Sequence, residues 1–120
     1  MAKPEFEFHI PDDSGWKQLN DRRPGIFQKI LSKDEATGNY TRLMRFEKGG
    51  DFTYAGVQVH DFWEEVWIIE GALTDLTLGK TFTAGSYACR PPGMRHGPYR
   101  SENGVMMFET RYFLDRAGTR

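Results

Sequence analysis

Two stretches of the sequence hold histidine and glutamate side chains at spacings that suit a metal site. The first stretch contains Gln58, His60 and Glu64, and the second runs through a Pro-Gly turn to His96. Side chains alternate along a strand, so Gln58 and His60 point to one face, and Glu64 opens the next strand. If these strands are neighbours in a barrel, the side chains converge on one interior point, which His96 reaches from another strand. We therefore predict Gln58, His60, Glu64 and His96 as metal ligands.

The predicted ligand set favours a transition metal. Two imidazoles and one carboxylate are the ligands that non-haem Fe(II) oxygenases use while leaving positions open for substrate and oxygen. The side-chain oxygen of Gln58 is a weaker ligand than an imidazole. We expect a divalent transition metal, with Fe(II) favoured and Mn, Ni or Zn as alternatives. The other interpretation is a barrel without metal, in which His60 and Glu64 form a hydrogen-bonded pair.

Two further side chains are candidates for contact with a substrate. Arg90 shares the strand parity of Ser86 and Ala88. If that parity faces inward, its guanidinium holds a carboxylate or enolate bidentately. The alternative is an ion pair with an acidic residue at the rim. Tyr99 either lines the mouth of the barrel or packs in the core. A second role for Glu64 is that of a general base that leaves the metal.

Other polar side chains are expected outside the site. Cys89 has the opposite parity to Arg90, and we interpret it as a small buried hydrophobic residue. Arg45 and Arg111 lie in alternating strands and are expected to face solvent. His9 is expected to be exposed, although it would complete a three-histidine site if the N-terminal arm folded over the barrel mouth.

Short strands must position these side chains. The chain has 13 Gly and 6 Pro, and 14% of its residues are aromatic, which favours strands and turns over helices. Turn residues recur roughly every eight to twelve residues, which is typical of all-β sandwiches and small barrels. The predicted strands are 26–31, 40–47, 52–60, 64–69, 73–78, 81–83, 87–90 and 104–113.

The length of 120 residues suits one domain. Within it, residues 1–39 are predicted to form an N-terminal arm and lead-in strands, 40–113 the barrel core, and 114–120 a polar tail. Three apolar side chains near the N-terminus alternate with polar ones, a pattern typical of a strand or extended arm: Phe6, Phe8 and Ile10.

Charge and hydropathy exclude several classes of protein. The chain has 16 Lys and Arg against 17 Asp and Glu, so it lacks the basic excess that nucleic-acid binding needs. No apolar run is longer than four residues, as in 66–69, which is too short to span a membrane, and the N-terminal residues do not resemble a signal peptide. The single cysteine suits a reducing compartment. We expect a soluble, cytoplasmic protein that binds a small-molecule substrate and neither nucleic acid nor membrane.

The two stretches resemble the signature motifs of the cupin superfamily. The first cupin motif is Gly-x5-His-x-His-x3-4-Glu-x6-Gly, and this chain has Gln58-x-His60-x3-Glu64-x6-Gly71. The second is Gly-x5-Pro-x-Gly-x2-His-x3-Asn, and this chain has Gly85-x5-Pro91-x-Gly93-x2-His96-x3-Arg100. The resemblance covers roughly residues 40–113. It implies an all-β, double-stranded β-helix (jelly-roll) barrel with a metal held between the motifs.

The chain departs from the two motifs at three positions. Gln58 stands where the family has its first metal histidine, Phe52 replaces the opening glycine, and Arg100 replaces the final asparagine. The first departure bears on metal binding, because the four-ligand site of the family is reduced to His60, Glu64 and His96, with Gln58 as a weak addition.

One cupin branch is similar in finer detail, at residues 60–65, 73–75, 85–98 and 108–112. It includes the zinc-binding cupin domain of certain anti-sigma factors and small dioxygenases acting on diketones and hydroxyacetophenones. The resemblance implies a metal-dependent enzyme acting on a small carbonyl-containing or phenolic molecule, with oxygenase chemistry favoured. The alternatives are a metal-dependent isomerase, cyclase or lyase that uses no oxygen, and a ligand-sensing cupin without catalysis. The resemblance also implies a homodimer with exchanged N-terminal arms.

Overall fold

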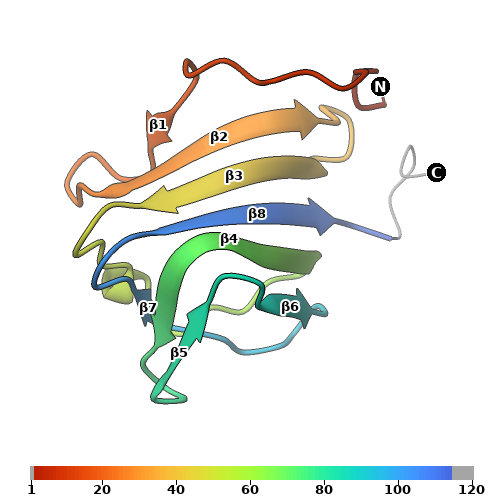
Figure 1. The fold of residues 1–120 in the computed structure, drawn as a ribbon. Helices are drawn as coiled ribbons and strands as arrows, with labels where there is room; N and C mark the ends of the chain where they lie inside the picture. The colour runs from red at the N-terminus through yellow and green to blue at the C-terminus, as the bar shows by residue number, and fades with distance from the viewer. Residues whose placement is uncertain (1, 115–120) are drawn as a thin grey trace.

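Antiparallel strands are the main secondary structure of residues 2–114, the part of the chain that the computed structural model describes (Figure 1). This confirms the all-β prediction, and most predicted strands are found with small shifts at their ends. The strands are β1 (Lys17–Gln18), β2 (Ile26–Lys33), β3 (Tyr40–Phe46), β4 (Trp63–Asp75), β5 (Lys80–Thr83), β6 (Tyr87–Arg90), β7 (Tyr99–Arg100) and β8 (Val105–Tyr112).

The long strand β4 joins two sheets into a jelly roll. Its first half pairs with β8 on one side and β6 on the other, in the sheet that continues through β3 and β2 to β1. Its second half pairs with β5 and β7. Figure 1 shows β4 bending sharply between the two halves. The two strands predicted at 64–69 and 73–78 are therefore one continuous strand, and the barrel interior lies on its concave side.

The bend in β4 requires the glycine at the end of the first motif. Gly71 has a φ of 81°, and a Cβ atom there would lie 2.2 Å from the carbonyl oxygen of Gly104 on the neighbouring chain segment. Glycine avoids both the unfavourable φ and the clash. Any other residue at position 71 would push apart β4 and the start of β8.

The barrel core is built from alternate residues of the strands, as the period of two requires. The inward positions of β3, β4 and β8 are largely apolar, and they pack together around the bend of β4. The buried apolar cluster consists of Ile26, Met44, Phe46, Val66, Ile68, Leu73, Tyr99, Val105 and Met107. Several inward positions at one end of the barrel are instead charged, and they form the site described below.

Two segments differ from the predicted strands. The prediction of a strand at 52–60 is wrong, because Thr53–Ala55 forms a short 3-10 helix and, within 52–60, only Gln58 forms a β-bridge, an isolated one to His96. The arm at 2–16 is extended without strand pairing, and β1 follows it. Of the predicted tail, only Leu114 lies within the described residues. Within residues 2–114, no helix is long and apolar enough to cross a membrane.

Candidate functional site

The structure brings His60, Glu64 and His96 together. Each offers one ligand atom, and these atoms all lie within 4.8 Å of one another. Glu64 is the second residue of β4 and points into the barrel, where its side chain is buried. His60 lies just before β4, and His96 is a buried residue between β6 and β7. Three residues from the two predicted motif stretches therefore form one cluster of potential ligands.

Backbone hydrogen bonds tie the two motif stretches to each other. The Gln58 amide donates to the His96 carbonyl at 2.7 Å, and the His96 amide donates to the Gln58 carbonyl at 3.0 Å. The Gly93 amide donates to the His60 carbonyl at 2.9 Å. Gly93 has a φ of 86°, which glycine adopts without strain, so it closes the turn after Pro91. The two histidines are thus placed by main-chain bonds rather than by side-chain packing alone.

Both imidazoles present an Nε2 atom that is buried and has no hydrogen-bond partner among the described residues. Burial lowers the pKa of His96 to about 4. It also lowers the pKa of His60. The neutral imidazole is the form that binds a metal ion. A buried polar atom without a partner is costly, and a coordinated ion would supply the missing interaction. The donor set of His60, Glu64 and His96 therefore fits a divalent transition metal.

The remaining predicted ligand, Gln58, lies beside this cluster. Its side chain lines a small inner cavity of about 40 Å³ together with those of Glu64 and His96. The next residue, Val59, is exposed and lines neither this cavity nor the larger pocket, so Gln58 and Val59 face opposite sides although the segment is not a strand. The third histidine, His9, is exposed in the arm and lies outside the cluster.

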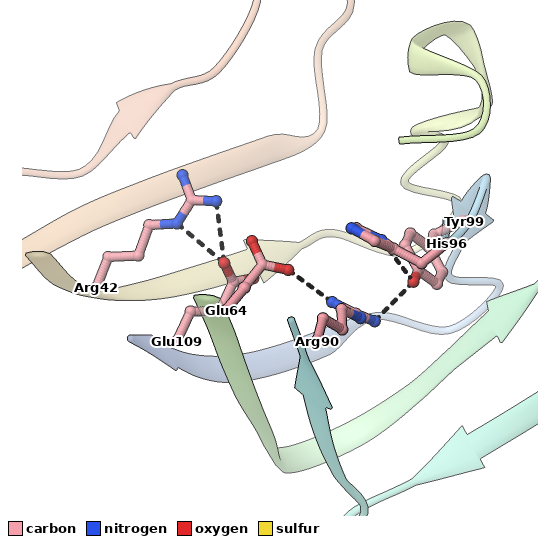
Figure 2. Close-up of polar contacts among 6 residues, drawn as sticks. All are labelled: Arg42, Glu64, Arg90, His96, Tyr99 and Glu109. Atoms are coloured by element: carbon pink, nitrogen blue, oxygen red, sulfur yellow. Dashed lines mark hydrogen bonds and ion pairs between the residues drawn. The ribbon is translucent and has the colours of Figure 1, made fainter. Parts of the chain in front are cut away.

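Arg90 points inward and pairs with one of the candidate ligands. Its Nη1 donates to Oε1 of Glu64 at 2.7 Å, and its Nη2 donates to the hydroxyl of Tyr99 at 2.6 Å. The partner is thus an interior carboxylate and not an acidic residue on the rim. The Tyr99 hydroxyl also lies 3.0 Å from Nδ1 of His96. Figure 2 shows the resulting chain of contacts from Glu64 through Arg90 and Tyr99 to His96.

The Tyr99 hydroxyl lies within hydrogen-bond distance of Nδ1 of His96 and so restrains the orientation of its ring. Burial raises the pKa of Tyr99 to about 12, so it stays a neutral phenol at physiological pH. If Nδ1 of His96 carries the proton and donates to this hydroxyl, the Nε2 lone pair is left free for a metal. Such contacts fix the tautomer and ring orientation of metal-binding histidines. His60 is held differently, with its ring stacked on Phe62 at a centroid distance of 4.5 Å.

A second buried ion pair lies beside Glu64 and was not anticipated. Both Nε and Nη2 of Arg42 donate to Oε1 of Glu109, at 3.2 and 3.0 Å (Figure 2). Arg42 Nη1 also donates to Gln28 at 2.6 Å. Burial raises the pKa of Glu109, although the Arg42 charge opposes this. The signal was present in the sequence, because Arg42 and Glu109 have the parity of buried Met44 and Met107.

Two expectations about neighbouring residues are wrong. Arg111 does not face solvent: its guanidinium lies between the rings of Tyr40 and Phe62, 4.2 and 4.4 Å from their centroids. Its Nε is buried without a hydrogen-bond partner in the described part of the chain. Cys89 is exposed rather than buried. It lies on the outer side of β6, a short strand whose outer surface is uncovered.

A larger pocket of about 410 Å³ opens next to the cluster. Arg90, His96 and Tyr99 form its polar end, where it meets the small inner cavity. Most of the other lining side chains are apolar: Val57, Val66, Ile68, Leu73, Leu78, Phe82, Ala88, Met94 and Met107. An apolar pocket with a few convergent polar groups is typical of a site for a small molecule.

Solved structures with the same fold are similar to this chain over most of its length. A RmlC-like cupin from Shewanella frigidimarina is 20% identical, with a TM-score of 0.70 and coverage of 93% of this chain and 94% of the other. An acetylacetone dioxygenase from Acinetobacter johnsonii is 19% identical, with a TM-score of 0.70 and coverage of 97% and 83%.

A match with a lower TM-score is the structure of SigE from Rhodobacter sphaeroides in complex with the anti-sigma factor ChrR. It is 21% identical with a TM-score of 0.61, and the match covers 82% of this chain but 48% of the other. These similarities confirm the jelly-roll fold.

No curated protein matches the chain significantly. The family described as the ChrR Cupin-like domain matches residues 7–114, which is nearly the whole chain. The chain therefore belongs to the ChrR cupin-like family of the cupins.

Proposed function

We propose that the protein is a metal-dependent enzyme acting on a small carbonyl-containing or phenolic molecule, and that it is an oxygenase. One observation carries the proposal. Nε2 of His60 and Nε2 of His96 are buried without partners beside the Glu64 carboxylate, next to a pocket of about 410 Å³. Two imidazoles and one carboxylate leave coordination positions open, which a structural metal site does not.

The residues of the site have separate roles in this proposal. His60, Glu64 and His96 hold the metal, with Gln58 as a weak ligand or a hydrogen-bond donor beside it. When bound, the metal supplies Lewis-acid activation of a substrate oxygen and the site at which oxygen reacts. The apolar pocket wall excludes water from the substrate. Arg90 and Tyr99 donate hydrogen bonds to a substrate oxygen and so orient the molecule.

The comparisons support the reaction class by analogy. A protein with this fold is named as an acetylacetone dioxygenase, which acts on a small diketone, and our proposal takes its substrate class from that name. At 19% identity this is analogy rather than demonstration, because one fold hosts many reactions. We place the protein in the cytoplasm, since its cysteine, Cys89, is an exposed free thiol that suits a reducing compartment.

A second candidate function is isomerase or lyase chemistry that uses no oxygen. The observation that favours it is Gln58, because an amide oxygen is a weaker donor than the histidine of the cupin motif and supports a redox metal less well. In that case Glu64 leaves the metal and moves a proton as a general base. A ligand-sensing role without turnover is the third outcome, and the similar fold of the anti-sigma factor ChrR, which was solved in complex with SigE, is consistent with a role other than catalysis.

Oxygen uptake distinguishes these functions. The protein loaded with Fe(II) is assayed with acetylacetone and with a hydroxyacetophenone, and product is followed in air and under nitrogen. We expect substrate-dependent oxygen uptake that is lost in His96→Ala and kept in His9→Ala, since His9 is an exposed histidine outside the cluster. Turnover that is equal under nitrogen would support the isomerase or lyase instead. Binding without turnover in either atmosphere would support the sensor.

A further inference from the structure

Arg90 connects the candidate metal site with the larger pocket. Its guanidinium has five N–H donors, of which one contacts Glu64 and one contacts Tyr99. No hydrogen bond from the other three is found within residues 2–114, and Arg90 lines the pocket of about 410 Å³. Because Arg90 lines a pocket with mostly apolar walls and has donors beyond these two contacts, it suits a carboxylate that carries an apolar body.

The other charged groups around this pocket leave that role to Arg90. Asp75 lines the same pocket, but its Oδ1 already accepts hydrogen bonds from the backbone amides of Thr77 and Leu78. Arg95 also lines the pocket and is exposed. Arg42, deeper in the barrel, is paired with Glu109 and lines only the small inner cavity. Arg90 is thus the inner cation that the pocket reaches.

The charge of Arg90 is balanced by a candidate metal ligand. The Arg90–Glu64 pair is mostly buried, with side-chain exposures of 13% and 9%. When Glu64 coordinates a divalent cation, its negative charge is shared with the metal and Arg90 loses its counter-ion. A mostly buried cation without a counter-ion is destabilised, and an anion in the pocket would restore the balance.

We propose that small carboxylates with an apolar body bind at Arg90 cooperatively with the metal. Metal at Glu64 strengthens carboxylate binding, and the carboxylate strengthens metal binding by the same factor, as linkage requires. This inference rests on the metal site of the proposed function and adds a ligand class, an anion with an apolar body. It also assigns Arg90 a role in coupling the two sites.

Calorimetric titration of a matched acid and amide tests the coupling. We would titrate 3-phenylpropanoate and 3-phenylpropanamide into metal-free and Zn²⁺-loaded protein, since zinc is redox-inert. The acid is expected to bind the zinc form at least about fivefold more tightly than the metal-free form, within the usual range of coupling between sites. The amide, which has the same shape without the charge, is expected to show no difference. Zn²⁺ affinity should rise by the same factor when the acid is saturating.

Variants show whether Arg90 carries the coupling. Arg90→Met is expected to abolish it, whereas Arg45→Met, which removes a cation stacked on Trp16 and Phe27 away from the pocket, is expected to keep it. If Arg90→Met does not fold, Arg90→Lys serves, because one ammonium cannot retain Glu64, Tyr99 and a carboxylate together, and the coupling should fall. Coupling that is unchanged in the Arg90 variant would overturn the inference, since the carboxylate would then bind the metal directly.

The outcomes separate this inference from the proposed function. Zinc binding at the cluster without any acid-specific coupling would overturn the inference and leave the metal enzyme standing. If zinc increased the affinity for the acid and for the amide equally, the inference would also be overturned and the metal enzyme would still stand. If zinc did not bind the wild-type protein, the proposed function would be overturned, and so would the coupling between metal and carboxylate.

Discussion

Glu64 and Arg90 face each other across the ladder between β4 and β6, and their side chains form an ion pair of 2.7 Å. The carboxylate that is best placed to bind a metal is therefore already neutralised by a cation of the protein. This relationship explains how the metal-free barrel tolerates a buried Glu64, since a buried charge needs a partner.

Removing Arg90 should destabilise the metal-free protein. Arg90→Met leaves Glu64 without its counter-ion, and breaking a mostly buried pair in this way costs about 3 kcal/mol. The free energy of unfolding from urea titration measures the loss. Arg90→Met combined with Glu64→Gln is expected to recover most of it, because no unpaired charge remains. A single variant as stable as wild type would contradict this account of the pair.

Acidification should destabilise the metal-free protein through His96. Burial holds the pKa of His96 at about 4, whereas the unfolded chain has the ordinary value of about 6.5. Between these values the unfolded state binds a proton that the folded state does not, so stability falls as the pH drops through this window and is unaffected above it. Urea unfolding at pH 7.5, 6 and 5 measures the slope. His96→Asn should make it shallower, and an unchanged slope would show that His96 is not the buried titrating group.

Restoring the cupin histidine should strengthen metal binding. Gln58 lines the small cavity with Glu64 and His96, so Gln58→His places a further imidazole beside the cluster. We expect the Kd for Zn²⁺ to fall at least tenfold, or about 1.4 kcal/mol. Val59→His is the matched control, because Val59 is 50% exposed and faces away. Equal affinities for the two variants would mean that position 58 does not reach the metal.

The sequence predicted the cluster of His60, Glu64 and His96 better than its surroundings. The spacing of the two motif stretches, together with the barrel that the cupin resemblance implies, is enough to bring these three residues together. The partners of Arg90 and Arg42 do not follow, since strand parity says that a side chain points inward but not which carboxylate lies opposite. Glu64 and Arg90 are 26 positions apart, and Arg42 and Glu109 are 67 apart, so both pairs depend on the strand order of the folded sheet.

Errors in the predicted strands also have physical causes. Gly71 looked like a turn between two strands, but it is the bend that lets one strand pass from the first sheet to the second. Cys89 was expected in the core because it is small and apolar, but position 89 alternates with inward-facing Arg90 on the uncovered side of β6. Parity alone would have placed Cys89 correctly.

The N-terminal arm leads us to propose a homodimer. Phe8 and Ile10 are 100% and 94% exposed, and an arm of this kind gains stability by burying its apolar side on a second copy. Sedimentation at micromolar concentration is expected to give twice the 13.9 kDa chain mass. Phe8→Asp with Ile10→Asp should shift the protein towards monomer, and Glu7→Ala should not. A monomeric wild-type protein would contradict the proposal.

Metal content decides whether His60, Glu64 and His96 hold a metal ion. Elemental analysis is made on the protein as purified without added metal and again after incubation with Fe(II), Mn²⁺, Ni²⁺ or Zn²⁺ followed by desalting. The account predicts about one equivalent of transition metal per chain in wild type and in His9→Ala, and little in His60→Ala or His96→Ala. Wild-type protein that retains none of these metals, or variants of His60 and His96 that retain as much as wild type, would contradict it.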